Sequence, residues 1–230
     1  MKRQFLALGA LLISTALLRA DLIVKQKVEG AGQAGDVTLR IKDNKIRADL
    51  PRDVSSITDA ATGEVITLMH PQKSFLRIPP EHTKAMIERM QKLAGANGGA
   101  DQPKLQPTGK KEKVGEWETE VFTSKIGGME TSYWIAKDFP NYQRVLESMT
   151  KVQQSSMGGL NKSLGPDPKE FPGMPVKTEM SLNGKKITST ITSVEEKPVD
   201  AAIFEVPKAY KEISLPPLPA TPAPAPAEPK

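Results

Sequence analysis

The 230-residue sequence contains no cysteine, only two histidines, and few aromatic residues, which make up 5% of the chain. Without cysteine the chain can form no disulfide, even in an oxidising compartment, and it cannot carry a lipid anchor on a cysteine. Beyond the first twenty residues, no apolar run approaches the roughly 20 residues that a membrane-spanning helix requires. We therefore expect no integral membrane span in the rest of the chain.

Motifs of catalytic, metal and cofactor sites are also missing. His70 and His82 do not have the spacing of metal ligands, and we interpret both as solvated surface residues. The sequence holds no G-x-S-x-G motif, which positions a nucleophilic serine. Residues 30–35 spell G-x-G-x-x-G, but a strand-like pattern follows where dinucleotide binding needs a helix, so we interpret them as a hairpin loop. The sequence predicts a protein that is not an enzyme, with no catalytic residue, metal site or cofactor.

The charge balance argues against nucleic acid as a partner. The formal net charge is +5, but removing Lys2, Arg3 and Arg19 leaves 29 basic residues against 27 acidic ones. Nucleic-acid-binding proteins instead show a clustered basic surface. The run at residues 110–113 (Lys-Lys-Glu-Lys) is interpreted as a solvated rim, with contact to anionic lipid or polysaccharide as the alternative.

The first twenty residues have the order of a secretory signal peptide. Lys2 and Arg3 precede an apolar run over residues 5–18, and Ala20 is a small residue at the end. This arrangement predicts cleavage after Ala20 and a periplasmic or secreted protein without a lipobox cysteine. An uncleaved membrane anchor is the alternative interpretation.

Alternating apolar and polar residues dominate the rest of the chain and predict antiparallel strands with one buried face. Asn183-Gly184 between two such runs is a strong hairpin signal. The expected strands are residues 22–28, 37–42, 46–50, 55–59, 64–69, 74–78, 110–114, 116–124, 130–136, 176–182 and 185–194.

Two stretches have helical periodicity instead. We expect helices over residues 81–94, after Pro79-Pro80, and over residues 140–154. Gly- and Pro-containing stretches at about 95–108 and 155–175 predict mobile loops. The chain then divides into a signal peptide (1–20), one domain (21–214) and a Pro/Ala-rich disordered tail (215–230).

Three segments resemble a known family of bacterial envelope proteins. They are residues 59–66 leading to Lys73-Ser74-Phe75, residues 133–137 (Tyr-Trp-Ile-Ala-Lys), and residues 173–176 continuing through the Asn183-Gly184 hairpin to Phe204 and Pro207. On these segments the chain resembles the domain of unknown function 4412 family. This resemblance implies a place within the lipoprotein-carrier-like superfamily, typified by the periplasmic lipoprotein carrier and its outer-membrane receptor.

The resemblance implies an α+β fold: a strongly curved antiparallel sheet, or open half-barrel, with two main helices in or over its concave face. In the carriers, the cavity between sheet and helices holds acyl chains. The resemblance spans about residues 21–212.

Two functions remain open from the sequence. The first is a non-enzymatic envelope protein that binds an apolar, lipid-like ligand between sheet and helices. The second is a structural or protein-interaction module of the envelope, which uses its Pro-rich tail or a sheet edge to bind an envelope protein. For the first function, the candidate cavity residues are Met86, Met90, Trp117, Trp134, Tyr142 and Met149, with ordinary core packing as the alternative for each.

Overall fold

A computed structural model of the protein describes residues 21–30, 33–83, 85, 103–126, 129–157, 166–182 and 184–215. Several predicted features lie outside these residues. They are the signal peptide (1–20), most of the helix at 81–94 with Met86 and Met90, the loop residues 95–102 and 158–165, and the tail from residue 216 onward.

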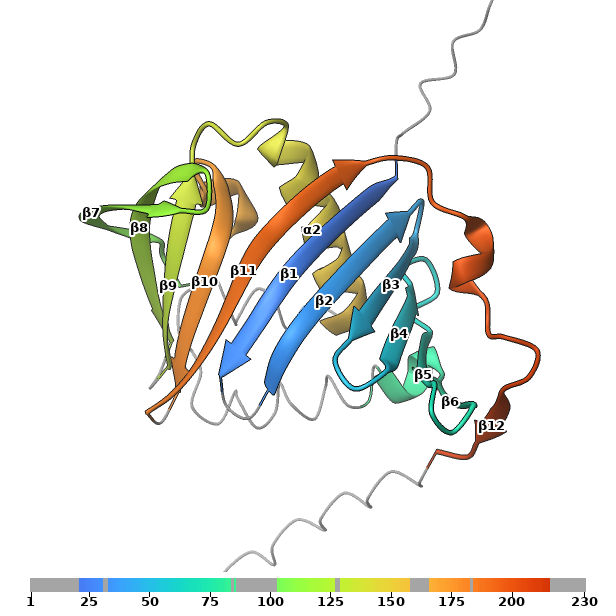
Figure 1. Ribbon diagram of the computed structural model, residues 1–230. Helices are drawn as coiled ribbons and strands as arrows, with labels where there is room; N and C mark the ends of the chain where they lie inside the picture. The colour runs from blue at the N-terminus through green and yellow to red at the C-terminus, as the bar shows by residue number, and fades with distance from the viewer. Residues whose placement is uncertain are drawn as a thin grey trace, which may run out of the picture.

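In the described residues, twelve strands form one open sheet (Figure 1). Their order is β12-β6-β5-β4-β3-β2-β1-β11-β10-β9-β8-β7, and neighbouring strands are antiparallel except β12 with β6. The strands are β1 (Leu22–Gly30), β2 (Gln33–Lys42), β3 (Lys45–Leu50), β4 (Val54–Asp59), β5 (Val65–Met69), β6 (Ser74–Ile78), β7 (Gln106–Val114), β8 (Trp117–Ile126), β9 (Met129–Ala136), β10 (Met174–Leu182), β11 (Lys185–Glu196) and β12 (Lys211–Ile213).

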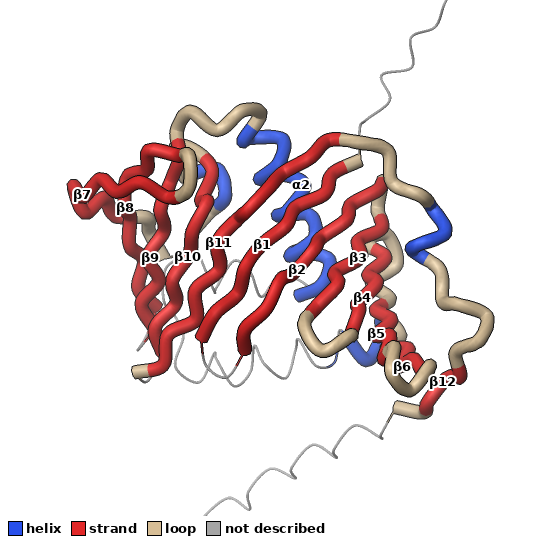
Figure 2. Tube along the Cα trace, viewed as in Figure 1, coloured by secondary structure: helices blue, strands red, loops and turns tan. Residues whose placement is uncertain are grey.

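Helices are few in the described part of the chain (Figure 2). The long helix α2 (Tyr142–Met157) crosses one face of the sheet, behind β1 and β11 in the view of Figure 1. Two short 3-10 helices, η1 (Pro168–Glu170) and η2 (Ala201–Phe204), lie in connecting segments. Residues 80–83 and 85 are also helical, and the residues that follow lie outside the described part of the chain.

The strand predictions are confirmed at all eleven expected stretches, with bounds that differ by a few residues. The G-x-G-x-x-G stretch forms a hairpin as predicted, because Gly30 pairs with Gln33 and Val28 pairs with Gly35. Leu182 pairs directly with Lys185, so the second hairpin has the expected two-residue connection. The strand β12 was not predicted, and the expected loop at 155–175 is interrupted by the end of α2, by η1 and by the start of β10.

The expected half-barrel with two main helices over a concave face is wrong. The sheet is large and open, because its end strands β12 and β7 do not pair with each other. In the described residues only α2 is a long helix on the sheet. The opposite face is covered by the C-terminal segment, residues 197–210, which has no long helix. Periodicity revealed the strands but not this non-helical cover, because an irregular segment has no periodic signal.

The apolar core is divided between the two faces of the sheet. Leu22 and Val24 of β1 pack in one cluster with Val145 of α2. Ile23 points to the opposite face, since successive strand residues alternate, and it packs in a second cluster with Val199 and Phe204 of the C-terminal segment.

A polar network joins the C-terminal segment to the second face. Its members are Arg40, Arg47, Asp49, Ser55, His70 and Tyr210. Arg47 donates from Nη1 to the carbonyl oxygen of Ile203 at 2.8 Å. At the other end, Tyr210 immediately precedes β12, and its hydroxyl lies 2.6 Å from His70 Nδ1. The network therefore fastens the segment at both η2 and β12.

The partners of Ser55 determine the proton positions in this network. Its hydroxyl donates to Asp49 Oδ1 at 2.7 Å and accepts from Arg47 Nη2 at 3.0 Å. Since Ser55 has only one proton, His70 Nε2 at 2.7 Å must donate to it. In the neutral imidazole, Nδ1 is then the acceptor for the Tyr210 hydroxyl proton. The Ser55 hydroxyl and both ring nitrogens of His70 then each have a hydrogen-bond partner.

The charge of Asp49 depends on these contacts. Burial tends to raise the pKa of Asp49, but hydrogen bonds from Ser55 and Arg47, together with the guanidinium charges, outweigh it and lower the pKa below its ordinary value. The folded protein therefore favours the ionised carboxylate.

We expect Tyr210→Phe to destabilise the fold by about 1 kcal/mol, because His70 Nδ1 loses its partner. Hydrogen exchange should also quicken in residues 197–213. Urea unfolding and exchange mass spectrometry would measure the two effects. Tyr142→Phe is the matched control, since the Tyr142 hydroxyl has no hydrogen bond to the described residues. If both variants lose the same unfolding free energy and show the same exchange rates, the hydrogen bond of Tyr210 does not hold the C-terminal segment in place.

We expect Asp49 to contribute to acid sensitivity. Because its pKa is lower in the folded state, its stabilisation is complete above the unfolded pKa of about 3.9 and is lost as the pH falls through the folded value. Asp49→Asn should therefore flatten the dependence of the unfolding free energy on pH between about pH 5 and pH 2. Urea melts across this range give the slope, with the exposed Glu205→Gln as control; an unchanged slope in Asp49→Asn would refute the assignment.

Candidate functional site

The helix α2 is fixed to the sheet at its N-terminal end. Asn141, just before it, has a left-handed backbone (φ 53°), and its carbonyl oxygen accepts from Val145 N at 3.2 Å. Arg144 Nη1 donates to Glu196 Oε2 at the end of β11, at 2.8 Å. Val145 is buried, and Met149, one turn on, also packs on the core. One stripe of α2 thus faces the sheet.

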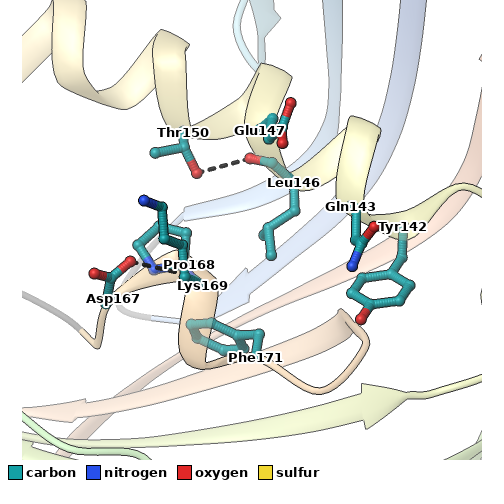
Figure 3. Close-up of a pocket in the computed structure, with 9 residues that line it drawn as sticks. All are labelled: Tyr142, Gln143, Leu146, Glu147, Thr150, Asp167, Pro168, Lys169 and Phe171. Atoms are coloured by element: carbon teal, nitrogen blue, oxygen red, sulfur yellow. Dashed lines mark hydrogen bonds between the residues drawn. The ribbon is translucent and has the colours of Figure 1, made fainter.

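A neighbouring flank of the same helix lines a pocket of about 520 Å³ (Figure 3). Successive residues of a helix are rotated by about 100°, so Leu146 lies beside the core stripe rather than in it. Figure 3 shows the Leu146 side chain directed toward the opposite wall, which residues 167–171 form. The lining residues are Tyr142, Gln143, Leu146, Glu147 and Thr150 of α2, and Asp167, Pro168, Lys169 and Phe171.

The opposite wall is held by local contacts around η1. Asp167 Oδ1 accepts from Lys169 N at 2.9 Å, which caps η1, and Pro168 occupies its first position. Phe171 is buried and meets the ring of Tyr133 on β9 edge-to-face, with the centroids 5.2 Å apart. At Gly173, a Cβ atom would come within 2.3 Å of the Ala136 carbonyl oxygen. Only glycine allows this close approach, which brings the segment onto the sheet.

Tyr133 supports Phe171 from the sheet. Burial raises the pKa of the Tyr133 phenol, and hydrogen bonds with Thr131 and Ser124 oppose this only in part. The phenol therefore stays protonated at neutral pH. Both of its partners are buried, so the wall of the pocket rests on an ordered polar cluster within the sheet.

The pocket is amphipathic. Leu146, Phe171 and Pro168 provide apolar surface, while Glu147, Asp167 and Lys169 bring charges of both signs. The Thr150 hydroxyl donates to the Leu146 carbonyl oxygen at 2.7 Å, so it already has a partner. Apolar pockets with a few polar groups, of about 300–1,000 Å³, are typical of small-molecule sites.

Of the predicted cavity residues that the structure describes, only Tyr142 lines this pocket. Met149 packs against the core cluster instead. Trp117 also packs there, with its ring 4.8 Å from that of Phe139. Met86 and Met90 lie outside the described residues.

Trp134 lies on the opposite side of the sheet from the pocket. Its neighbour Tyr133 contacts the pocket wall, and adjacent strand residues face opposite sides. The Trp134 indole N–H donates to Glu112 Oε2 at 2.7 Å, and Lys177 Nζ lies 4.0 Å from its ring centroid. These contacts give Trp134 a packing role on that side.

Sequence reasoning missed Leu146 and Phe171. The helical periodicity of α2 includes Leu146 in a broad apolar stripe and does not separate the part that packs from the part that borders a pocket. Phe171 fell in a stretch expected to be a mobile loop. The one available signal for a packed residue there was an aromatic side chain in a stretch rich in Gly and Pro.

Ser55 and His70 are within hydrogen-bond distance, as a catalytic serine and its histidine base are, but they do not form a catalytic pair. The Ser55 proton is directed to Asp49, and Ser55 is only 1% exposed. A serine nucleophile instead needs to give its proton to the base and be accessible to substrate. The expectation that His70 is a solvated surface residue is also wrong, because both ring nitrogens are hydrogen-bonded within the protein.

Among the described residues, no group of three or more His, Cys, Asp or Glu side chains is arranged to hold a metal ion. Within the same residues, no helix combines the length and the apolar character needed to cross a membrane.

The family model "Domain of unknown function (DUF4412)" matches residues 22–210, so the chain belongs to this family. No curated protein matches the sequence. The chain is similar to the Mycobacterium tuberculosis lipoprotein LppX at 12% identity and a TM-score of 0.41, covering 79% of this chain and 88% of LppX.

Two crystal forms of PNGF-II are also similar. The C2 form gives 12% identity and a TM-score of 0.38, and the P21 form gives 10% and 0.39. These matches cover 85% of this chain but only 31% and 32% of PNGF-II. Such low TM-scores do not establish a shared fold.

We expect Val145→Ala and Leu146→Ala to differ in stability although they are adjacent. Val145 is 1% exposed, so its truncation should cost about 2 kcal/mol through lost burial and a new cavity. Leu146 borders the pocket, so its truncation should cost less than about 1 kcal/mol. Urea unfolding of both variants measures the difference, and equal costs would show that Leu146 is a core residue.

Proposed function

We propose that this protein is an exported, non-enzymatic envelope protein, periplasmic or secreted, that binds an apolar, lipid-like ligand in the pocket between α2 and residues 167–171. The observation that carries the proposal is the amphipathic pocket of about 520 Å³ beside the core stripe of α2. The order of charges, apolar run and small residue in residues 1–20 supports export.

Burial of apolar surface would supply the affinity. Each methylene removed from water contributes about 0.8 kcal/mol, so a chain of about ten methylenes supplies about 8 kcal/mol before the cost of association. Leu146 and Phe171 would contact the apolar chain, and the charged rim would stay with the polar end. No covalent chemistry is required for this function.

The resemblance to the lipoprotein-carrier-like superfamily supports the same class of ligand. Its segments at 133–137 and 173–176 lie on β9 and at the start of β10, next to the wall that contains Phe171. In the carriers, acyl chains occupy the cavity of the fold. We assign to this chain the same kind of cargo but a site of its own, built on α2 and η1.

The sheet edge is a less suitable binding surface. Apart from Val114, the side chains of the edge strand β7 are exposed, and they include Lys110, Lys111 and Lys113. The strand also contains Pro107 and a register shift between Pro107 and Lys111. Lysine, proline and bulges are the features that protect edges from added strands. The structure therefore favours the pocket over this edge, while a role for the Pro-rich tail stays a prediction.

We expect Leu146→Asp to weaken binding of a fluorescent fatty-acid probe at least tenfold, because it places a charge on the apolar wall. Leu146→Trp, which fills the pocket without adding charge, should have a similar effect. Ser148→Asp is the matched control, since it adds the same charge to another flank of α2, where its hydroxyl bonds only the Arg144 carbonyl oxygen among the described residues. Fluorescence titration and thermal unfolding report binding and folding separately.

Native mass spectrometry of the protein from its own envelope fraction, followed by solvent extraction, would identify a natural ligand. A stoichiometric lipid would support the proposal. A protein that carries no ligand and takes up no probe would overturn it, as would binding that Leu146→Asp and Leu146→Trp leave unchanged in folded protein.

A further inference from the structure

The rim of the pocket carries two charges of opposite sign, on Lys169 and Glu147. Within the part of the chain that the structure describes, neither the Lys169 ammonium nor the Glu147 carboxylate forms an ion pair. The third charged residue, Asp167, already accepts the Lys169 backbone N–H and caps η1. A ligand in the pocket would therefore meet a cation from one wall and an anion from the other.

These two charges come from different walls. Lys169 belongs to η1, and Glu147 belongs to α2, one residue after Leu146. Figure 3 shows the Lys169 side chain directed toward α2 near Thr150, and the Glu147 carboxylate on the outer side of the helix near Leu146. The Lys169 ammonium thus lies beside the space between the walls, and Glu147 borders the pocket at the outer edge of α2.

Resting on the proposed function, we infer that the ligand of this pocket is a zwitterionic amphiphile: a single acyl chain whose head group joins a phosphate-type anion to an ammonium cation. The anionic group binds Lys169, the ammonium group binds Glu147, and the chain packs between Leu146 and Phe171. This arrangement gives Lys169 and Glu147 each an opposite charge on the ligand.

A ligand of one charge sign suits the rim less well. A purely anionic head group would pair with Lys169 but would be repelled by Glu147 and Asp167. A purely cationic head group would pair with the carboxylates but would be repelled by Lys169. Unfavourable placement of like charges gives specificity by weakening the wrong ligands.

The test compares three detergents with the same twelve-carbon chain: dodecylphosphocholine, dodecyl sulfate and dodecyltrimethylammonium. Calorimetric titration of the folded protein below each micelle concentration should show dodecylphosphocholine binding at least tenfold tighter than the other two. Lys169→Gln and Glu147→Gln should each reduce this preference to within about threefold, without abolishing binding of the chain. Lys45→Gln, an exposed charge removed on β3, is the matched control and should keep the full preference.

Each other outcome has a defined meaning. Tightest binding of dodecyl sulfate or dodecyltrimethylammonium would overturn the zwitterionic assignment, and so would equal binding of all three. A preference that survives both Lys169→Gln and Glu147→Gln would overturn the role of these residues. If none of the detergents binds, the proposed function fails and this inference fails with it, whereas binding without head-group preference leaves the proposed function standing.

Discussion

The central strand β1 has to bury both of its faces at once, and the rest of the structure depends on this constraint. Leu22, Ile23 and Val24 are all buried, although adjacent strand residues point in opposite directions. Each face therefore needs its own cover. The helix α2 covers one face through Val145, and the C-terminal segment covers the other through Val199 and Phe204.

The two covers differ in structure: one is an irregular segment that stabilises the fold, and the other is a helix that also borders the candidate binding pocket. The C-terminal segment lacks a long helix, so side-chain hydrogen bonds to Arg47 and His70 hold it in place. The helix α2 satisfies its own backbone and needs fewer such contacts. Its flank is consequently available to form a pocket wall, with Leu146 beside the packed Val145. The same helix closes the core and shapes the candidate ligand site.

Local pattern predicted much of the fold but little of the site. Alternation located eleven strands, and two-residue hairpin chemistry correctly paired Leu182 with Lys185. The half-barrel expectation failed because it assigned the cover of the sheet to two helices. Among the predicted cavity residues, Tyr142 lines the pocket, while Trp134 lies on the opposite side, stabilised by Glu112 and Lys177. Their aromatic character predicted that these residues would pack inside the protein, but it did not indicate which residues they would contact.

The sequence by itself determined eleven of the twelve described strands, the hairpins and the amphipathic helix α2, because their signals lie in residues close together in the chain. Only the tertiary structure decided which side of the sheet each element covers and which flank of α2 borders the pocket. It also brought His70 to Tyr210, which is 140 residues away. Periodicity specifies which residues share a face, but packing between distant segments decides what that face meets.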